Sequence, residues 1–335
     1  MTSGALREPA HAGIIPVPLR LTAVPPDEAG RLSTVTGLNG YAWERLGDGA
    51  APTVFYRGTG PKKSVFLKKI PCAHKEVQLF GDSIARWAFN QAVSANKMLP
   101  GFPVPYGAEY ALFGYAWHDG EYYSRWDEGR FVRLGRELGR LHKALKTFPE
   151  LDAVKGNKAT FIAGLDAIRR DLAGGEKRTP FFAEDIRKIA AESSFDLPGM
   201  SSPVLIHGDI NPGNVLFSDD RLVLLDFEHS RFCFFPPELE LSFVLERFML
   251  IHGAWSPERV QRFLASYVSG GGEVTALDDA CIIRNLRWLR LMAFCRLQQA
   301  QRLAPGEWTK MIALWTWING CEKNGWMPFI SAETV

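Results

Sequence analysis

The segment over residues 204–228 limits the possible folds more than any other part of this 335-residue chain. An apolar run ends at His207, and a polar loop carrying Asp209 and Asn214 follows it. Two short apolar runs separated by a tight turn then lead to Asp226, which is the pattern of a β-hairpin. Because the strands of a hairpin lie side by side, we expect Asn214 and Asp226 at its two ends to approach each other.

Three oxygen-bearing side chains, those of Asp209, Asn214 and Asp226, are thereby predicted to converge at one end of the hairpin. Oxygen ligands suit Mg²⁺, which usually takes one or two protein ligands and completes its shell with phosphates and water. The spacing from Asp209 to Asn214 is that of a protein-kinase catalytic loop, and Asp226-Phe227-Glu228 stands where kinases carry Asp-Phe-Gly. The pattern predicts metal-assisted phosphoryl transfer, because the transition state of that reaction is mostly charge.

The motif that joins these residues resembles that of the aminoglycoside phosphotransferase and choline kinase superfamily. The resemblance implies a two-lobed, protein-kinase-like α+β fold and a transfer of phosphate from ATP, with Mg²⁺, to a hydroxyl group of a small molecule. It implies that Asp209 is the catalytic base or orients the hydroxyl, and that Asn214 and Asp226 bind Mg²⁺. It also implies that His207 holds the loop in shape by bonding to backbone near Asp226. Glu228 is a candidate for contacting the substrate.

Softer similarities extend the resemblance over about residues 38–300. Residues 134–142 resemble the helix ending in Leu-His that precedes the catalytic region in these enzymes. Residues 102–105 resemble the turn after the long helix of their small lobe.

Short alternating runs in the N-terminal third predict a small antiparallel sheet, and the later chain has mostly helical periodicity. We expect an irregular leader over 1–30, a nucleotide-binding lobe over 31–117, and a lobe with the catalytic loop and acceptor-binding helices over 118–335. The expected strands are 41–46, 53–57, 64–70, 110–117, 121–125, 204–206, 215–217 and 222–225. The expected helices are 27–36, 75–98, 130–146, 158–173, 182–192, 237–251, 256–270, 277–302 and 306–324.

A glycine pair lies where the superfamily has the loop that covers the nucleotide phosphates. Gly47 and Gly49 would let backbone N–H groups approach phosphate oxygens. The same Gly-Asp-Gly is equally typical of an ordinary hairpin turn. The resemblance implies ATP as the donor, with GTP as the alternative.

The strand over 64–70 is predicted to bind the nucleotide through one of its faces. Phe66 and Lys68 share a face, which puts Phe66 against adenine and Lys68 on the α- and β-phosphates. Lys69 is the alternative, because a slip of one residue exchanges the faces. Glu76 is the first candidate for the carboxylate that pairs with this lysine, although its place at a helix start also suits the helix dipole. Asp82 is the second candidate.

The residues after Glu228 lead into a helix without an Ala-Pro-Glu element or a long activation segment. A platform for a peptide is therefore missing, which favours a small acceptor such as an aminoglycoside-like antibiotic, a sugar or an amino alcohol. Over 231–335, 11 basic residues stand against 10 acidic ones, so no acidic excess favours a polycation. The tryptophans of this region fit a core better than a cage for a quaternary ammonium group. Glu238 and Glu240 are further candidates for contacting substrate or capping a helix.

The overall charge and the cysteines exclude several classes of protein. The net charge of +2 gives no electrostatic reason to expect nucleic acid or an anionic membrane as a partner. The five cysteines lack any Cys-x-x-Cys pair, so a disulfide framework is not expected and a reducing cytosol fits. No signal-peptide layout and no apolar run of about 20 residues is present. We expect a cytoplasmic monomer or homodimer.

Two other functions compete with an active kinase. A catalytically weak, nucleotide-binding regulatory protein of the same fold would be expected to lack a catalytic residue, yet the whole motif is present. Only the short spacing between Lys68 and Glu76 supports it. A metal-dependent phosphoesterase using His207 and Asp209 would need further ligands, and the seven histidines form no such cluster.

Overall fold

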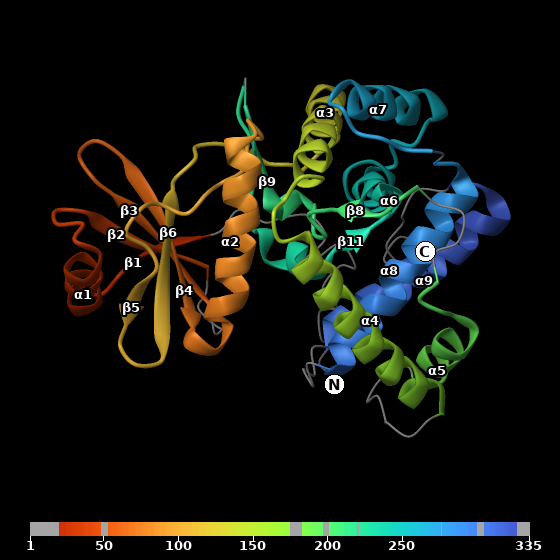
Figure 1. Cartoon of the computed structure of the whole chain (residues 1–335), viewed down its shortest axis with the longest axis horizontal. Helices are drawn as coiled ribbons and strands as arrows, with labels where there is room; N and C mark the ends of the chain where they lie inside the picture. Colours follow the sequence, from red (N-terminus) through yellow and green to blue (C-terminus); the bar gives the residue numbers. More distant parts are fainter. Residues whose placement is uncertain are drawn as a thin grey trace, which may run out of the picture.

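The chain folds into two lobes, which the computed structural model describes for residues 20–47, 53–174, 183–196, 201–219, 221–275, 277–299 and 305–326. Figure 1 shows the smaller lobe on the left, with a sheet and the helix α2 beside it, and the larger helical lobe on the right. This arrangement confirms the predicted α+β class with a small antiparallel sheet in the N-terminal lobe.

The sheet of the small lobe has six strands in the order β1-β2-β3-β4-β6-β5, and all neighbouring strands are antiparallel. One face carries a core of Trp43, Tyr56, Leu67 and Leu112, against which Leu32 of α1 packs. The strands are β1 (Leu21–Ala23), β2 (Ala42–Leu46), β3 (Val54–Thr59), β4 (Ser64–Pro71), β5 (Val104–Tyr106) and β6 (Tyr110–Ala116).

The expected irregular leader is too long at its C-terminal end. Leu21 pairs with Leu46, so β1 extends the sheet by one strand. The expected helix over 27–36 is confirmed as α1 (Pro26–Thr36), which begins with proline at its first position. Residues 21–30 therefore belong to the small lobe, while residues 1–19 lie outside the described part of the chain.

The helix α2 (Lys75–Asn90) ends earlier than the predicted residue 98. The chain after it forms bridges instead of further helical turns. The Leu224 N–H donates to the Ser94 carbonyl over 2.8 Å, and the Asn96 N–H donates to the Leu224 carbonyl over 2.9 Å. Pairing with a strand of the other lobe thus replaces the helical hydrogen bonds, which local periodicity could not predict.

The larger lobe contains the other described helices and two small sheets. β7 (Glu121–Tyr122) does not extend the six-stranded sheet but pairs with β9, so the chain changes lobe after residue 117. One sheet consists of β10 (Leu222–Leu224), β9 (Val215–Phe217) and β7, in that order. The other pairs β11 (Phe234–Phe235) with β8 (Val204–Leu205). The helices are α3 (Glu128–Leu145), α4 (Leu151–Gly174), α5 (Ala183–Glu192), α6 (Pro237–Phe248), α7 (Pro257–Ser269), α8 (Asp279–Gln299) and α9 (Pro305–Asn324). Among the described residues, no helix is both long and apolar enough to cross a membrane.

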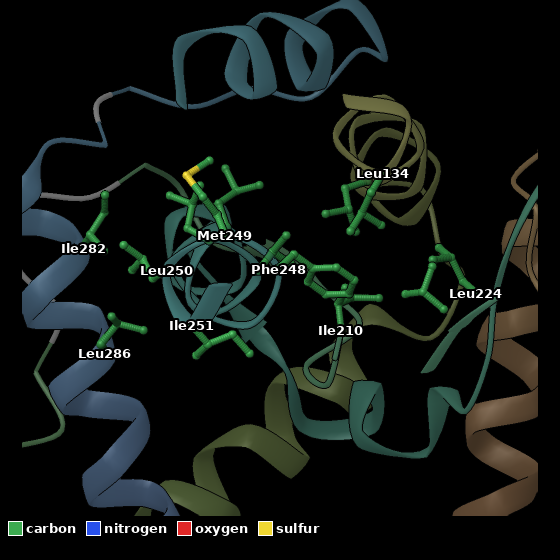
Figure 2. Close-up of a cluster of buried hydrophobic side chains, with 14 of the residues drawn as sticks. Leu134, Ile210, Leu224, Phe248, Met249, Leu250, Ile251, Ile282 and Leu286 are labelled. Atoms are coloured by element: carbon green, nitrogen blue, oxygen red, sulfur yellow. The ribbon is translucent and has the colours of Figure 1, made fainter. Parts of the chain in front are cut away.

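The core of the larger lobe surrounds α6, which is buried along almost its whole length. Figure 2 shows Phe248 between Leu134 of α3, Ile210 of the polar loop and Leu224 of β10. A helix buried on all sides is expected where apolar residues cover most of its surface. Because Ile210 is fully buried in this core, the loop that carries Asp209 is fixed to α6 by packing as well as by hydrogen bonds.

The two lobes meet where α2 crosses the short 3₁₀ segment η3 (Phe227–Phe232). A Cβ atom at Gly81 of α2 would lie 2.8 Å from the Cα atom of Glu228, which is closer than side chains tolerate. Glycine at this position therefore allows the helix to approach the backbone just after Asp226.

We predict that Gly81→Ala separates α2 from η3 and destabilises the protein by about 1–3 kcal/mol, because backbone atoms must move to admit the methyl group. Gly156→Ala is the matched control, since a Cβ at this position of α4 meets no atom within 4 Å. The control should be neutral or stabilising by up to about 1 kcal/mol, as expected for alanine in a helix. Urea unfolding of both variants measures the difference, and equal midpoints would contradict the close approach.

Candidate active site

Asp209 and Asn214 lie together in the polar loop after β8. The Nδ2 atom of Asn214 donates to the Asp209 backbone oxygen over 2.9 Å and to its Oδ2 atom over 3.0 Å. The Nδ2 atom of Asn211 donates to Asp209 Oδ1 over 3.0 Å, and Asn211 Oδ1 accepts the Gly213 N–H over 2.8 Å. Two amide side chains therefore fix both carboxylate oxygens of Asp209.

The hairpin brings Asn214 close to the segment that carries Asp226, as the sequence predicted. Val215 of β9 pairs with Leu224 of β10, and the Leu225 N–H donates to the Asn214 carbonyl over 2.9 Å. Asp226 has a φ of 60°, which is uncommon for a residue with a side chain and turns the chain sharply after β10. The three oxygen-bearing residues of the motif thus lie at one end of the hairpin.

Lys68 of β4 reaches this site from the small lobe. Its Nζ atom lies 3.0 Å from Asp226 Oδ1 and 3.1 Å from Glu228 Oε2, and the residue is 7% exposed. Burial alone would lower the pKa of Lys68, but the two carboxylates raise it, so the ammonium group stays charged. The neighbouring Lys69 lies on the other face, where its Nζ atom is 5.0 Å from the ring centre of Tyr106.

The other residues predicted for the nucleotide side have different surroundings. Phe66 shares the face of Lys68 and stacks on Phe55, with 5.6 Å between ring centres. Glu76 is exposed in the first turn of α2, and the ion pairs described for Lys68 are with other residues. Gly47 follows β2 with a φ of 85°, which favours glycine. Gly49 lies outside the described residues.

The second candidate on α2, Asp82, is buried beside Tyr115. The Tyr115 hydroxyl lies 3.0 Å from Asp82 Oδ1 and 3.1 Å from its Oδ2 atom, and the carboxylate is close enough to Lys68 to feel its charge. Burial raises the pKa of Asp82 to about 7, although Tyr115, Lys68 and Gln78 act in the opposite direction.

The sequence did not reveal the network that holds the catalytic loop from behind. Glu240 of α6 accepts the N–H of Gly208 over 2.5 Å and that of His207 over 3.3 Å. His142 of α3 donates to Glu240 Oε2 over 2.7 Å, and its Nδ1 atom lies 2.8 Å from the Tyr267 hydroxyl. All these side chains are buried. Glu240 was a candidate for contacting substrate, but its burial gives it a structural role instead.

His207 has the expected structural surroundings. Its Nε2 atom donates to the Leu225 carbonyl over 2.8 Å, one residue before Asp226. Its Nδ1 atom accepts the Asp209 N–H over 3.3 Å, and its ring packs against Phe227 with 4.4 Å between ring centres. The imidazole therefore links the two ends of the site.

Sequence reasoning also missed His229, which lies beside Asp209, and Arg296, which contacts His229. The Nδ1 atom of His229 is 3.5 Å from Asp209 Oδ2, and its Nε2 atom is 3.0 Å from an amino group of Arg296. The available signal for His229 was its position directly after the Asp-Phe-Glu sequence. Nothing near Arg296 in the sequence distinguishes it from a surface arginine of α8.

The sequence over residues 42–278 matches the phosphotransferase enzyme family. The chain belongs to this family. The match covers most of the small lobe and the part of the larger lobe that contains the catalytic loop. No curated protein shows significant sequence similarity to the chain.

Solved structures confirm the fold of this phosphotransferase family member. The GDP complex of wild-type aminoglycoside 2'-phosphotransferase-IIIa has a TM-score of 0.60 at 13% identity, covering 88% of this chain and 98% of that one. Choline kinase from Cryptosporidium parvum Iowa II has a TM-score of 0.56 at 10% identity, with 86% and 92% covered. Spectinomycin phosphotransferase with ADP and spectinomycin has a TM-score of 0.54 at 15% identity, with 90% and 94% covered. The family match confirms the resemblance seen in the sequence, and these structures agree with it in fold.

We predict that Glu240→Ala lowers the free energy of unfolding by about 3–5 kcal/mol, because two backbone N–H groups and His142 lose their buried acceptor. Asp152→Ala is the matched control, since that carboxylate is 96% exposed and pairs with Lys155 of the same helix. Such a surface pair contributes at most about 1 kcal/mol. Urea unfolding measures both changes, and a loss no larger than that of the control would contradict the anchoring role.

Asp82 predicts a pH dependence of stability. Its pKa of about 7 in the folded chain exceeds the ordinary value of 3.8, so the folded state holds this proton more tightly. The contribution of this group to the free energy of unfolding is greatest below about pH 4. It falls as the pH rises to about 7, by at most ~1.4 kcal/mol per pH unit. Asp82→Asn should remove this slope from urea unfolding curves, whereas the exposed-site variant Asp152→Asn should keep it. An unchanged slope in Asp82→Asn would refute the prediction.

Proposed function

We propose that this protein transfers the γ-phosphoryl group of ATP, with Mg²⁺, to a hydroxyl group of a small molecule. The observation that carries the proposal is the convergence of Asp209, Asn214 and Asp226 at one end of the hairpin, with Lys68 reaching them from the other lobe. Family membership supports phosphoryl transfer as the reaction. Relatives in the solved structures are named with ADP and GDP, which supports a nucleotide site.

The side chains at the hairpin end fit a magnesium ion. The Asn214 amide nitrogen donates to Asp209, which leaves the side-chain oxygen of Asn214 for a metal ion. Asp226 uses Oδ1 for Lys68, which leaves Oδ2 for a metal. One amide oxygen and one carboxylate are the few protein ligands that Mg²⁺ usually takes. When bound, Mg²⁺ would neutralise charge on the transferring phosphates.

Asp209 suits the role of proton acceptor. Burial raises its pKa, while the hydrogen bond from Asn211 lowers it, so it binds a proton more readily than an exposed aspartate. The acceptor oxygen would form a bond to the γ-phosphorus, the bond from that phosphorus to ADP would break, and the hydroxyl proton would pass to Asp209. The two amides that hold the carboxylate orient it before the acceptor binds.

Lys68 suits the nucleotide phosphates, since it is charged, buried and next to Asp226. We propose that it exchanges part of its contact with Asp226 and Glu228 for phosphate oxygens, with Phe66 against the base and Gly47 at the phosphate-covering loop. Asp82 is a better candidate than Glu76 for the carboxylate of α2 that interacts with this lysine. Asp82 is buried near Lys68, whereas Glu76 is exposed.

The short path after Asp226 supports a small acceptor. Only η3 and the two-residue strand β11 separate Asp226 from α6. These elements are packed on α2 and on β8, so they provide no extended surface for a peptide. A sugar, an amino alcohol or an aminoglycoside-like compound each remains within this class.

A nucleotide-binding regulatory protein is the second candidate. The observation that favours it is the pairing of Lys68 with Asp226 and Glu228, which occupies the lysine that the phosphates would need. Such a protein would bind Mg·ATP without turning it over.

We predict that Asp209→Asn lowers kcat for phosphorylation by about 10²–10⁴-fold, because the amide cannot accept the proton and can keep only one of the hydrogen bonds from Asn211 and Asn214. Asp226→Ala should abolish both turnover and the Mg²⁺-dependent part of ATP binding. Asp152→Ala, on the exposed face of α4, should match the unmodified protein. ATP consumption with sugars, amino alcohols and aminoglycosides measures turnover, and calorimetry measures Mg·ATP binding.

The outcomes separate the candidates. Normal Mg·ATP binding with no turnover of any acceptor supports the regulatory protein. Unchanged turnover in Asp209→Asn or Asp226→Ala would refute the proposed roles of these residues.

A further inference from the structure

A positive charge that acts on Asp209 comes from an arginine next to His229. Arg296 of α8 lies 3.0 Å from the Nε2 atom of His229, and guanidinium nitrogens only donate hydrogen bonds. The Nε2 atom therefore accepts, and the proton of a neutral His229 is on Nδ1, facing Asp209 at 3.5 Å. Burial and then the charge of Arg296 lower the pKa of His229 to about 3. His229 is thus neutral, and Arg296 supplies the cation.

Arg231 provides a second cation, close enough to Arg296 to feel its charge. It lies in η3, three residues after Glu228, and the charges of Glu228 and Arg296 both act on it. Its Nε atom is buried without a hydrogen-bond partner among the described residues. Among those residues, neither Arg231 nor Arg296 forms an ion pair with a carboxylate. Without a carboxylate partner among the described residues, the two guanidinium groups are available to an anionic ligand.

The carboxylates that follow Asp226 are already occupied. Glu228 pairs with Lys68. Glu238 accepts hydrogen bonds from the Ser201 hydroxyl and from the Thr275 N–H. Glu240 anchors the catalytic loop, and Glu246 pairs with Arg290. A polycationic acceptor would need several free carboxylates next to Asp209, and of these four only Glu228 would be released, if Lys68 moves to the nucleotide phosphates.

We propose that the acceptor carries a carboxylate or phosphate group close to its reactive hydroxyl, and that Arg296 and Arg231 bind this group. The inference rests on the proposed phosphotransferase function and narrows its substrate class. Guanidinium groups bind such anions through paired, charge-assisted hydrogen bonds. The contact would hold the hydroxyl beside Asp209 and offset the repulsion between an anionic acceptor and the nucleotide phosphates.

Two matched sets of polyols test the preference. The three-carbon set contains glycerol 3-phosphate, D-glycerate, glycerol and 3-amino-1,2-propanediol. The six-carbon set contains D-glucitol 1-phosphate, D-gluconate, D-glucitol and 1-amino-1-deoxy-D-glucitol, all changed at C1. Within each set only the terminal group changes, so kcat/KM with Mg·ATP reports the effect of its charge. We expect kcat/KM for an anionic member to exceed that of its neutral and ammonium counterparts by about tenfold or more. The carboxylate and phosphate members tell which anion is preferred.

Three arginine variants test the residues. Arg296→Met and Arg231→Met should each raise KM for the preferred anion by about tenfold or more and leave KM for ATP almost unchanged. Arg296→Lys should recover part of the loss. Arg287→Met is the matched control, since this arginine of the same helix pairs with Asn319 and Glu322 on α9. The control should leave both KM values unchanged.

Three results would overturn the inference. One is equal or better turnover of the neutral or ammonium members, which would leave the proposed phosphotransferase function intact. Another is the absence of turnover with every anionic member while Mg·ATP still binds. The third is a loss of kcat for all acceptors in Arg296→Met with unchanged KM, which would make this arginine a positioning residue for His229 and Asp209.

Discussion

The buried carboxylate of Glu240 is the interaction on which the catalytic loop depends. It accepts hydrogen bonds from two consecutive N–H groups of the loop and from His142, in a region without access to water. Three donors stabilise its negative charge, and together they lower its pKa even though burial alone would raise it. Because the loop backbone is fixed in this way, Asp209 and Asn214 have a defined position relative to the helical lobe.

The relation between the lobes depends on a second set of contacts, around the chain that follows Asp226. Gly81 lets α2 approach the backbone of Glu228, and Lys68 pairs with the carboxylates of Asp226 and Glu228. Residues after α2 also bridge to Leu224 in the hairpin. The two ends of the site are therefore held by both lobes, so a shift between the lobes would change the distance between Lys68 and Asp226.

Arg296 and Arg231 give the part of the larger lobe around His229 a local positive charge. The overall charge of the chain is close to balanced, so composition carried no information about this local excess. Arg296 is 67 residues from His229 in the sequence, and Arg231 is adjacent only to apolar neighbours and Ser230. The local charge depends on which charged side chains are already ion-paired. Those ion pairs form only when the helices pack together.

The sequence by itself determined the family, the α+β class, most helices and strands, and the convergence of Asn214 with Asp226. These features follow from local spacing: helical periodicity, and a hairpin whose two ends must meet. It also predicted the structural role of His207, which depends on a bond within the same segment. Only the tertiary structure decided that Lys68 and not Lys69 faces the site, and that Glu240 is an anchor. Those outcomes depend on contacts between residues far apart in the chain, such as the 98 residues between His142 and Glu240. Burial and pairing across such separations are set by packing, for which a single sequence has no local signal.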